Sequence, residues 1–356
     1  MKIKTITLHC TDNCGSTLQS LALQKYLSDQ GHDTQLVDYT PSYLKYNGSF
    51  IKHVIKSVIF FKDVFNQNRK NKAFWRKYLR VTAENYPNYS ALKANAPKAD
   101  IFITGSDQIW NPSYLCGRDP AYYLDFVADG VPKYAYAASV GKDEVPADQK
   151  SLIVSYAKRF QAISVREKCT KDWLETEVDC PVEHVCDPVF LLDAEEYRAI
   201  EKKPENLGKY ILVYLVQPSK ELDTLLDFLR EKLGAKVVLI YGAKDNCKCD
   251  VHIRDVSPEE FLGYIDAATY VVASSFHATA FSCILRKQFS VVLPQRNTVR
   301  IEDILSVAEL NQRIIRNVSD ITENVLTPID YDSAWGKLGS FVRHSKNVLN
   351  SYCKEK

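Results

Sequence analysis

The sequence has almost no net charge and no long hydrophobic run. Its 46 Lys and Arg residues are balanced by 44 Asp and Glu, which leaves a formal net charge of +2 at pH 7. A nucleic acid is therefore not expected as the main partner, because nucleic-acid-binding proteins concentrate basic side chains on one face. No stretch approaches the roughly 18 apolar residues of a membrane span, and residues 1–4 lead into a predicted strand rather than a signal peptide. We expect a cytoplasmic protein.

Sequence spacings that hold a metal or a nicotinamide cofactor are also missing. The ten cysteines are scattered, and Cys247 and Cys249 enclose a single residue with no second Cys or His pair nearby. This distribution favours reduced thiols over disulfides or a zinc site. The first predicted β–α–β unit lacks the glycine-rich dinucleotide fingerprint. We therefore predict neither a metal nor a cofactor.

Alternating strands and helices run along two halves of the chain. Short apolar or β-branched segments predict strands at 2–8, 34–38, 101–104, 133–139, 162–168, 210–216, 236–241, 270–273 and 289–293, and a further strand with its turn at 184–190. Amphipathic segments between them predict helices, so both halves should form parallel, doubly wound α/β sheets. The polar stretch 202–208 contains proline and glycine and is the predicted linker. We expect a Rossmann-like domain at 1–203, a second one at 204–330 and a terminal helix within 331–356.

Residues 267–287 form the junction around which the other predictions are arranged. The buried strand at 270–273 stops at Ser274 and Ser275, and a helix of small and apolar residues follows. The unpaired N–H groups at the start of that helix should attract an anion such as phosphate or carboxylate, and either serine can cap it. His277 in the first turn would then titrate near neutral pH beside the anion. The alternative is a capped helix with a half-buried histidine.

Short polar side chains follow the strand predicted at 101–104. Asp107, Gln108 and Asn111 lie just beyond its carboxyl end, an arrangement suited to binding hydroxyl groups. Trp110 stands among them and has two interpretations, stacking on a sugar face or filling the core.

Arginines stand near two further strand ends. Arg166 lies in the segment 162–168, where a guanidinium can bind a carboxylate or phosphate through two hydrogen bonds. A surface salt bridge is the alternative for this residue. Arg296 and Arg300 follow the strand at 289–293 and add two cations at the edge of the sheet where open α/β folds bind ligands.

Residues 41–95 are basic and rich in aromatic side chains. The aromatic residues that interleave with lysines and arginines include Phe50, Phe60, Phe61, Phe65, Phe74, Trp75 and Tyr78. Amphipathic helices with a basic face bind membrane surfaces, so the segment could hold an acidic or lipid-linked substrate at the inner face of the membrane. The alternative is a pair of amphipathic helices packed over the domain.

Five motifs follow one another along nearly the whole chain. They are NCGSTLQSLAL at 13–23, GSDQIWN at 105–111, SVRE at 164–167, DPV at 187–189 and SSFHATAF at 274–281. Together they resemble the polysaccharide pyruvyl transferase family, and their shared order is far more specific than any single motif. One departure is Cys14, which stands where many members carry an aromatic residue in an Asn-Tyr-Gly sequence.

The resemblance implies a fold similar to the GT-B glycosyltransferases, with two Rossmann-like domains facing each other across a cleft. The family activity is transfer of pyruvate from phosphoenolpyruvate to two hydroxyls of a sugar, which forms a cyclic ketal on a cell-surface polysaccharide or its precursor. Phosphoenolpyruvate is then a co-substrate, the acceptor is a sugar or a lipid-linked oligosaccharide, and no metal is required. The first domain would bind the acceptor and the second the donor.

The resemblance gives roles to the polar and charged residues that follow the predicted strands. We expect the donor phosphate and carboxylate to be bound by Arg166, Arg296, Arg300 and the N–H groups that follow Ser274 and Ser275. The predicted acceptor-binding residues are Asn13, Gly15, Ser106, Asp107 and Gln108. His277 is the candidate acid that protonates the methylene carbon of the donor, and Asp107 is a candidate base.

Two other functions fit the same sequence. A GT-B glycosyltransferase with a nucleotide-sugar donor is the leading alternative, because fold does not fix function. Stabilisation by a nucleotide-sugar rather than by phosphoenolpyruvate would identify it. A non-catalytic sugar-binding protein is the other alternative, and its sugar binding would tolerate loss of His277.

Overall fold

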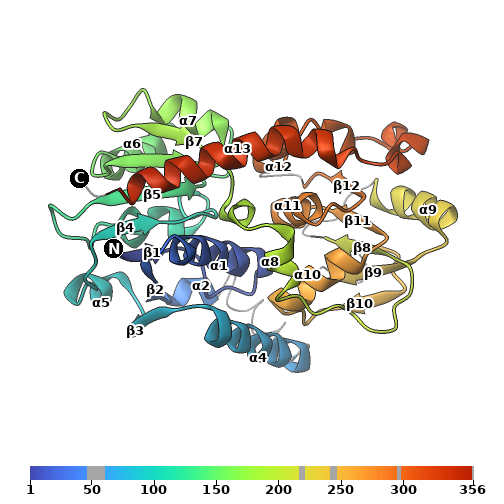
Figure 1. Ribbon diagram of the computed structural model, residues 1–356, viewed down its shortest axis with the longest axis horizontal. Helices are drawn as coiled ribbons and strands as arrows, with labels where there is room; N and C mark the ends of the chain where they lie inside the picture. The colour runs from blue at the N-terminus through green and yellow to red at the C-terminus, as the bar shows by residue number, and fades with distance from the viewer. Residues whose placement is uncertain (46–60, 216–220, 241–246, 295–297, 355–356) are drawn as a thin grey trace. The chain divides into compact units, whose positions relative to one another are not determined.

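The computed structural model forms two compact units and describes the chain outside residues 46–60, 216–220, 241–246, 295–297 and 355–356. The first unit comprises Met1–Phe61, Trp75–Leu191 and Phe341–Lys356, and the second comprises Lys62–Phe74 and Leu192–Ser340. Each unit has its own sheet and hydrophobic core. In Figure 1 the strands of the first unit run from blue to green, and those of the second from yellow-green to orange.

The first unit is built on a seven-stranded, wholly parallel sheet with the order β3-β2-β1-β4-β5-β6-β7. Its strands are β1 (Lys2–Ile6), β2 (Asp33–Tyr39), β3 (Val81–Tyr86), β4 (Ile101–Thr104), β5 (Lys133–Ala138), β6 (Ala162–Val165) and β7 (Val182–His184). Its helices include α1 (Cys14–Asp29), α2 (Ser42–Lys45), α5 (Tyr89–Ala94), α6 (Ala147–Ala157) and α7 (Lys168–Leu174). Central strands such as β4 are buried along their whole length, because both faces of the sheet are covered.

The core of the first unit contains an aromatic stack around Trp110. Trp110 is fully buried, lies 5.4 Å from the Tyr123 ring centroid in a stacked geometry, and meets Phe160 edge to face. Its indole N–H donates to the Tyr122 carbonyl at 3.1 Å. Trp110 therefore fills the core and is not a stacking surface for a sugar.

The second unit is built on a six-stranded parallel sheet with the order β10-β9-β8-β11-β12-β13. Its strands are β8 (Tyr210–Tyr214), β9 (Lys236–Ile240), β10 (Val251–Ile253), β11 (Tyr270–Ala273), β12 (Phe289–Val292) and β13 (Ile314–Ile315). Its helices include α8 (Ala194–Arg198), α9 (Leu222–Leu233), α10 (Pro258–Ala267), α11 (Phe276–Ile284) and α12 (Val299–Val307). Two long helices, α4 (Phe61–Tyr78) and α13 (Tyr331–Tyr352), contribute residues to both units.

Both sheets reverse their strand order once, which confirms the predicted doubly wound folds. In the first unit the reversal lies between β1 and β4, and in the second unit between β8 and β11. Open α/β sheets bind ligands outside the carboxyl ends of the strands at such a switch point. The two places to search for a site are therefore the loops after β1 and β4 and the loops after β8 and β11.

The basic aromatic segment at 41–95 is described only in part. Phe50 and Phe60 lie outside the described residues, and the described part forms the short helix α2, helix α4, edge strand β3 and the short helix α5. Phe74 on α4 is fully buried and Phe65 is exposed. Packing of the helix accounts for part of the aromatic content, and contact with a membrane surface stays a prediction.

The main segment of the second unit begins at Leu192, ahead of the predicted linker at 202–208. Its last part, Tyr331–Ser340, is the first half of α13, which was predicted to start a separate terminal element.

Within the described ranges, no helix is both long and apolar enough to cross a membrane.

Candidate functional site

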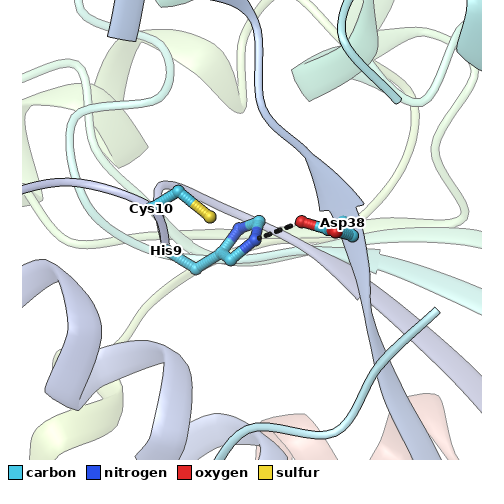
Figure 2. Close-up of side chains that lie close together, drawn as sticks. All are labelled: His9, Cys10 and Asp38. Carbon is cyan, nitrogen blue, oxygen red and sulfur yellow. Dashed lines mark hydrogen bonds and ion pairs between the residues drawn. The ribbon is translucent and has the colours of Figure 1, made fainter. Parts of the chain in front are cut away.

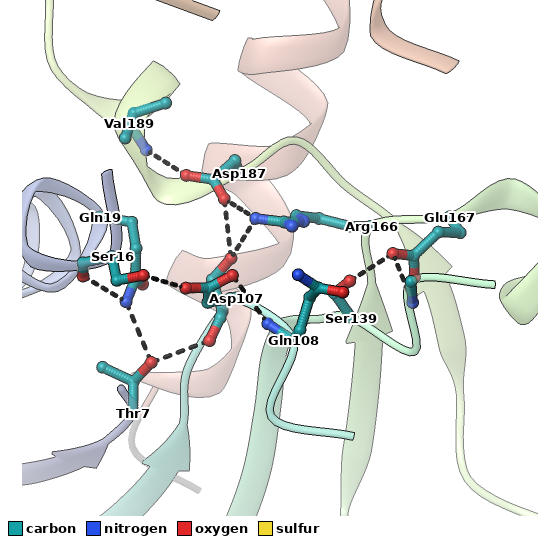
Figure 3. Close-up of polar contacts among 12 residues, drawn as sticks. Thr7, Ser16, Gln19, Asp107, Gln108, Ser139, Arg166, Glu167, Asp187 and Val189 are labelled. Atoms are coloured by element: carbon teal, nitrogen blue, oxygen red, sulfur yellow. Dashed lines mark hydrogen bonds and ion pairs between the residues drawn. The ribbon is translucent and has the colours of Figure 1, made fainter. Parts of the chain in front are cut away.

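The switch point of the first unit carries a buried polar cluster. It is made of Thr7 after β1, Ser16 and Gln19 on α1, Ser106 and Asp107 after β4, Arg166 after β6 and Asp187 after β7 (Figure 3). We call this set the first-unit cluster. Because parallel strands end at one edge of a sheet, residues far apart in sequence meet there.

An ion pair between Arg166 and Asp187 forms the centre of the first-unit cluster. The two side chains are only 2% and 0% exposed. Ser106 Oγ donates to Asp187 Oδ2 at 2.9 Å and accepts from Arg166 Nη1 at 3.2 Å, while the Val189 N–H donates to Asp187 Oδ1 at 3.0 Å. Arg166 is therefore part of a buried network, and the surface salt bridge considered from sequence is wrong. Its binding of a donor stays a prediction.

Asp107 has an unusual backbone conformation within the first-unit cluster. Its φ of +66° lies in the left-handed region, which residues other than glycine rarely adopt and which is common at functional sites. This conformation places the carboxylate where Ser16 Oγ donates to Oδ2 and the Gln108 N–H donates to Oδ1 at 2.9 Å. The acid is thereby joined to the start of α1.

The five predicted acceptor-binding residues all lie at this switch point. Asn13 is the N-cap of α1, and its Oδ1 accepts from the Gly15 N–H at 2.9 Å. The bond between Ser16 and Asp107 joins that helix start to the Ser106–Gln108 turn. The structure thus brings Asn13, Gly15, Ser106, Asp107 and Gln108 together, although their binding of an acceptor stays a prediction.

Gln108 is packed against a glycine that the turn after β5 requires. Gln108 Oε1 accepts from Asn111 Nδ2 at 2.7 Å. Gly141 has a φ of +69°, and a Cβ at that position would lie 2.7 Å from Gln108 Oε1 and 2.8 Å from Asn111 Nδ2. Any larger residue at Gly141 would displace both amides.

Glu167 and Asp187 are two polar residues that sequence reasoning left without a role. Glu167 is fully buried, accepts from the Ser139 hydroxyl, and accepts from the Val140 and Gly141 N–H groups at 3.2 Å each. It thereby holds the turn that contacts Gln108. Glu167 belongs to the SVRE motif and Asp187 to the DPV motif, and each follows a strand. That position at a strand end was the sequence signal that could have identified them as site residues.

The switch point of the second unit is formed by the start of helix α11. Ser275 is its N-cap, and Ser275 Oγ accepts from the Ala278 N–H at 3.2 Å. Ser274 has a different role, because its N–H and its hydroxyl both donate to the Tyr214 carbonyl, at 3.0 Å and 3.3 Å. Ser275 therefore caps the helix, and Ser274 ties the end of β11 to β8.

His277 and Arg300 gather around Phe276 at the start of α11. His277 is 7% exposed, and its ring centroid lies 5.3 Å from that of Phe276. The Arg300 guanidinium carbon lies 5.8 Å from the Phe276 ring centroid, and Arg300 is in the first turn of α12. We call Ser275, Phe276, His277 and Arg300 the second-unit cluster.

The charges of the second-unit cluster favour an anion. The start of α11 carries the positive end of its helix dipole, and an N-terminus with unpaired N–H groups binds phosphate or carboxylate. Arg300 adds a full positive charge, although the first turn of a helix disfavours a cation by about 0.3–1 kcal/mol.

The predicted donor residues divide between the units. Ser274, Ser275 and Arg300 belong to the second unit, as does His277, whereas Arg166 belongs to the first. Arg296 lies outside the described residues. The structure thus brings His277 and Arg300 together within the second unit, whereas Arg166 belongs to the first unit.

Comparisons with known proteins identify both the family and the fold. Residues 13–295, well over half of the chain, match the family model named polysaccharide pyruvyl transferase. No curated protein matches the chain in sequence.

Solved structures of two epimerases share the fold. A UDP-GlcNAc 2-epimerase from Neisseria meningitidis, bound to UDP-GlcNAc, is 13% identical over 100% of both chains with a TM-score of 0.56. The UDP-GlcNAc 2-epimerase from Methanocaldococcus jannaschii is 12% identical over 98% of this chain and 100% of its own, with a TM-score of 0.54. At such identities the likeness concerns the fold alone, and it confirms the GT-B-like class with its two parallel α/β sheets.

Proposed function

Because the chain belongs to the polysaccharide pyruvyl transferase family, we propose that it transfers pyruvate from phosphoenolpyruvate to two hydroxyls of a sugar and releases phosphate. The product is a cyclic pyruvate ketal on a cell-surface polysaccharide or its precursor, which includes a lipid-linked oligosaccharide. The proposed transfer uses neither a metal nor a cofactor. We further propose that the protein acts in the cytoplasm, at the inner face of the membrane when its acceptor is lipid-linked.

One observation carries the donor assignment, namely the second-unit cluster. Phosphoenolpyruvate presents a phosphate and a carboxylate, both of which suit a helix N-terminus beside a guanidinium. Arg300 and His277 both contact Phe276 at the start of α11, so a cation and a titratable ring lie at the same helix end. That combination supports binding of an acid-labile anionic donor.

The proposed chemistry needs one proton donor at the methylene carbon. Protonated His277 donates its proton to that carbon, which becomes a methyl group and leaves C2 electrophilic. A sugar hydroxyl then forms a C2–O bond and gives its proton to the proposed base, Asp107. The bond between C2 and the phosphate oxygen breaks, and the released phosphate takes up that proton. Attack by the second hydroxyl closes the ketal, and its proton restores the acid. Fixed positive charge at α11 and Arg300 stabilises the departing phosphate.

The first-unit residues keep the acceptor roles that were predicted from sequence. Asp107 has its carboxylate at the switch point, joined to Ser16, and is the proposed base for an acceptor hydroxyl. Arg166, which is paired with Asp187, is the proposed donor ligand from the first unit.

A glycosyltransferase with a nucleotide-sugar donor is the second candidate. The observation that favours it is the shared fold with a solved epimerase whose structure contains UDP-GlcNAc. A diphosphate would also suit a helix N-terminus with an arginine beside it.

Thermal unfolding with each donor separates the two candidates. Phosphoenolpyruvate and a panel of uridine and guanosine diphosphate sugars are added to the protein in turn. A ligand at about 100 times its dissociation constant adds roughly 2.7 kcal/mol of stability, which shifts the midpoint visibly. We expect a shift with phosphoenolpyruvate alone. A shift with nucleotide-sugars alone would instead make the protein a glycosyltransferase and remove His277 from its proposed role.

A further inference from the structure

Three side chains with metal-binding atoms meet beside the first-unit cluster. His9 and Cys10 follow β1, and Asp38 lies on the neighbouring strand β2. One ligand atom from each residue lies within 4.8 Å of the other two. Figure 2 shows the Cys10 thiol and the Asp38 carboxylate both close to the imidazole ring of His9. An imidazole nitrogen, a thiolate and a carboxylate are the three ligand types that zinc binds in proteins.

The hydrogen bonds of His9 leave one nitrogen facing the acid. Nδ1 lies 3.3 Å from the Thr7 carbonyl, which can only accept, so the proton is on Nδ1. Nε2 lies 3.3 Å from Asp38 Oδ1. In the neutral imidazole both of these atoms carry lone pairs, so a direct attraction between them needs a positive species there. That species is either a second proton on the ring or a metal ion.

The distance between His9 Nε2 and Asp38 Oδ1 matches the spacing of two ligands on one zinc ion. Charge-assisted N–H···O bonds are about 2.7–2.9 Å long, which is shorter than the 3.3 Å between His9 Nε2 and Asp38 Oδ1. Tetrahedral zinc with bonds of about 2.0–2.1 Å places its nitrogen and oxygen ligands about 3.3 Å apart. We propose that His9, Cys10 and Asp38 bind a zinc-class divalent cation at the carboxyl ends of β1 and β2.

Neighbouring groups hold these ligands in place. Asn85 Nδ2 donates to Asp38 Oδ2 at 2.9 Å and so turns Oδ1 towards His9. Thr17 Oγ1 donates to the His9 carbonyl at 3.4 Å and ties the loop to α1. A carbonyl on the far nitrogen of a histidine and an amide on the far oxygen of a carboxylate are the usual supports of metal ligands. The Asp38 side chain is 23% exposed, which gives an ion a path to the site.

The three ligands leave a fourth position for water or for an oxygen of a bound molecule. Zinc sites with three protein ligands and one open position are typical of catalytic zinc, whereas structural sites are closed by four. The site is independent of the proposed pyruvyl transfer, whose steps use no ion. Failure of either proposal therefore leaves the other standing.

Metal titration of the 356-residue protein tests the site. Metal-free protein is titrated with Zn²⁺ against a coloured chelator, and separately with Co²⁺, whose bond to a thiolate gives a near-ultraviolet charge-transfer absorption. We expect a single tightly bound ion per chain and the cobalt–thiolate absorption. Cys10→Ser should abolish that absorption, Asp38→Asn should weaken binding, and Asn85→Leu should weaken it by about 10–100-fold.

Cys180→Ser is the matched control. Cys180 is also a half-buried thiol of the first unit, but within the described chain it belongs to no group of metal-binding side chains. This variant should titrate like the wild type. The proposal is wrong if the wild type binds no tighter than Cys10→Ser, or if the cobalt–thiolate absorption survives in Cys10→Ser. In either case His9 and Asp38 form an imidazolium–carboxylate pair, and circular dichroism of each variant excludes unfolding as the cause of a loss.

Discussion

The two switch points place an arginine in opposite electrostatic surroundings. In the first unit Arg166 is buried against Asp187, and Ser106 bonds to both of them. In the second unit Arg300 lies against the ring of Phe276, in the first turn of α12 and beside the start of α11. The first arrangement neutralises its own charge, whereas the second adds positive charge to a positive helix end. The comparison indicates that the same residue type near a strand end can tie a buried network together in one unit and stand beside a helix N-terminus in the other.

Loss of the second-unit histidine gives the largest expected effect. His277→Ala should lower the transfer rate under saturating phosphoenolpyruvate by about 10²–10⁴-fold, because a positioned acid contributes that much. Donor-induced stabilisation should remain. The control is His344→Ala, since His344 is a half-exposed histidine on α13. A variant that keeps more than about a tenth of the wild-type rate would remove His277 as the acid.

Breaking the first-unit ion pair should affect stability most. Asp187→Ala leaves Arg166 buried without its carboxylate, which costs about 3–5 kcal/mol in urea unfolding. The double variant Arg166→Met with Asp187→Leu should be less destabilised than Asp187→Ala, because no charge stays buried.

The control for this measurement is an exposed acid of the same unit. Asp172→Ala removes a surface pair with Lys168, whose side chains are 66% (Lys168) and 48% (Asp172) exposed, and should cost no more than about 0.5 kcal/mol. Equal losses in Asp187→Ala and Asp172→Ala would show that the pair with Arg166 is not the electrostatic centre of the cluster.

Removing the second-unit cation should act on donor affinity. Arg300→Ala should weaken phosphoenolpyruvate binding by about 10–100-fold, since a hydrogen bond to a charged group is worth about 1.5–3 kcal/mol. Arg286→Ala is the matched control in the same unit, because Arg286 pairs with Asp332 on the exposed surface. Isothermal titration of both variants measures the difference. Unchanged affinity in Arg300→Ala would place the donor elsewhere.

The smallest expected effect is a pH dependence of the first unit. Burial lowers the pKa of His184, although its bond to the Arg166 carbonyl at 3.1 Å opposes that shift. The folded pKa is below the unfolded value of about 6.5, so stability should fall as pH decreases from about 6.5 towards the folded pKa. His184→Gln should lose less stability over that interval in urea unfolding. Parallel pH curves for the two proteins would contradict this assignment.

Strand ends were the part of the site that sequence could predict. Asp107 and Ser275 follow short buried strands, and the carboxyl ends of parallel strands meet at one edge of the sheet. Both positions were found because a buried strand reads as a continuous apolar run. The five motifs in their shared order indicated the family. The alternation of predicted strands and helices indicated the fold class.

Which side chains contact one another within the site could not be predicted from the sequence. Asp187 contacts Arg166 because β6 and β7 are neighbours in the sheet. The periodicity of apolar residues predicts single strands but does not predict their order in the sheet. The group around His9 and Asp38 depends in the same way on the pairing of β1 with β2. Pairings of this kind become visible only when the strand order is known.

Edge strands were missed for a related reason. β3 has only Thr82 and Tyr86 buried, and its remaining side chains are exposed. An edge strand that buries so few residues shows neither a long apolar run nor a clear alternation. The basic aromatic composition of residues 41–95 therefore suggested a pair of amphipathic helices and no strand.

Ser275→Asp tests the central claim that the start of α11 binds the anionic donor. Aspartate is as good an N-cap as serine and favours the positive end of the helix dipole, so the free energy of unfolding should stay within about 0.5 kcal/mol of the wild type. The added carboxylate should repel phosphoenolpyruvate and weaken its binding by at least about tenfold. Isothermal titration and urea unfolding on the same sample measure both quantities. A stable Ser275→Asp protein that binds phosphoenolpyruvate as tightly as the wild type would contradict the account.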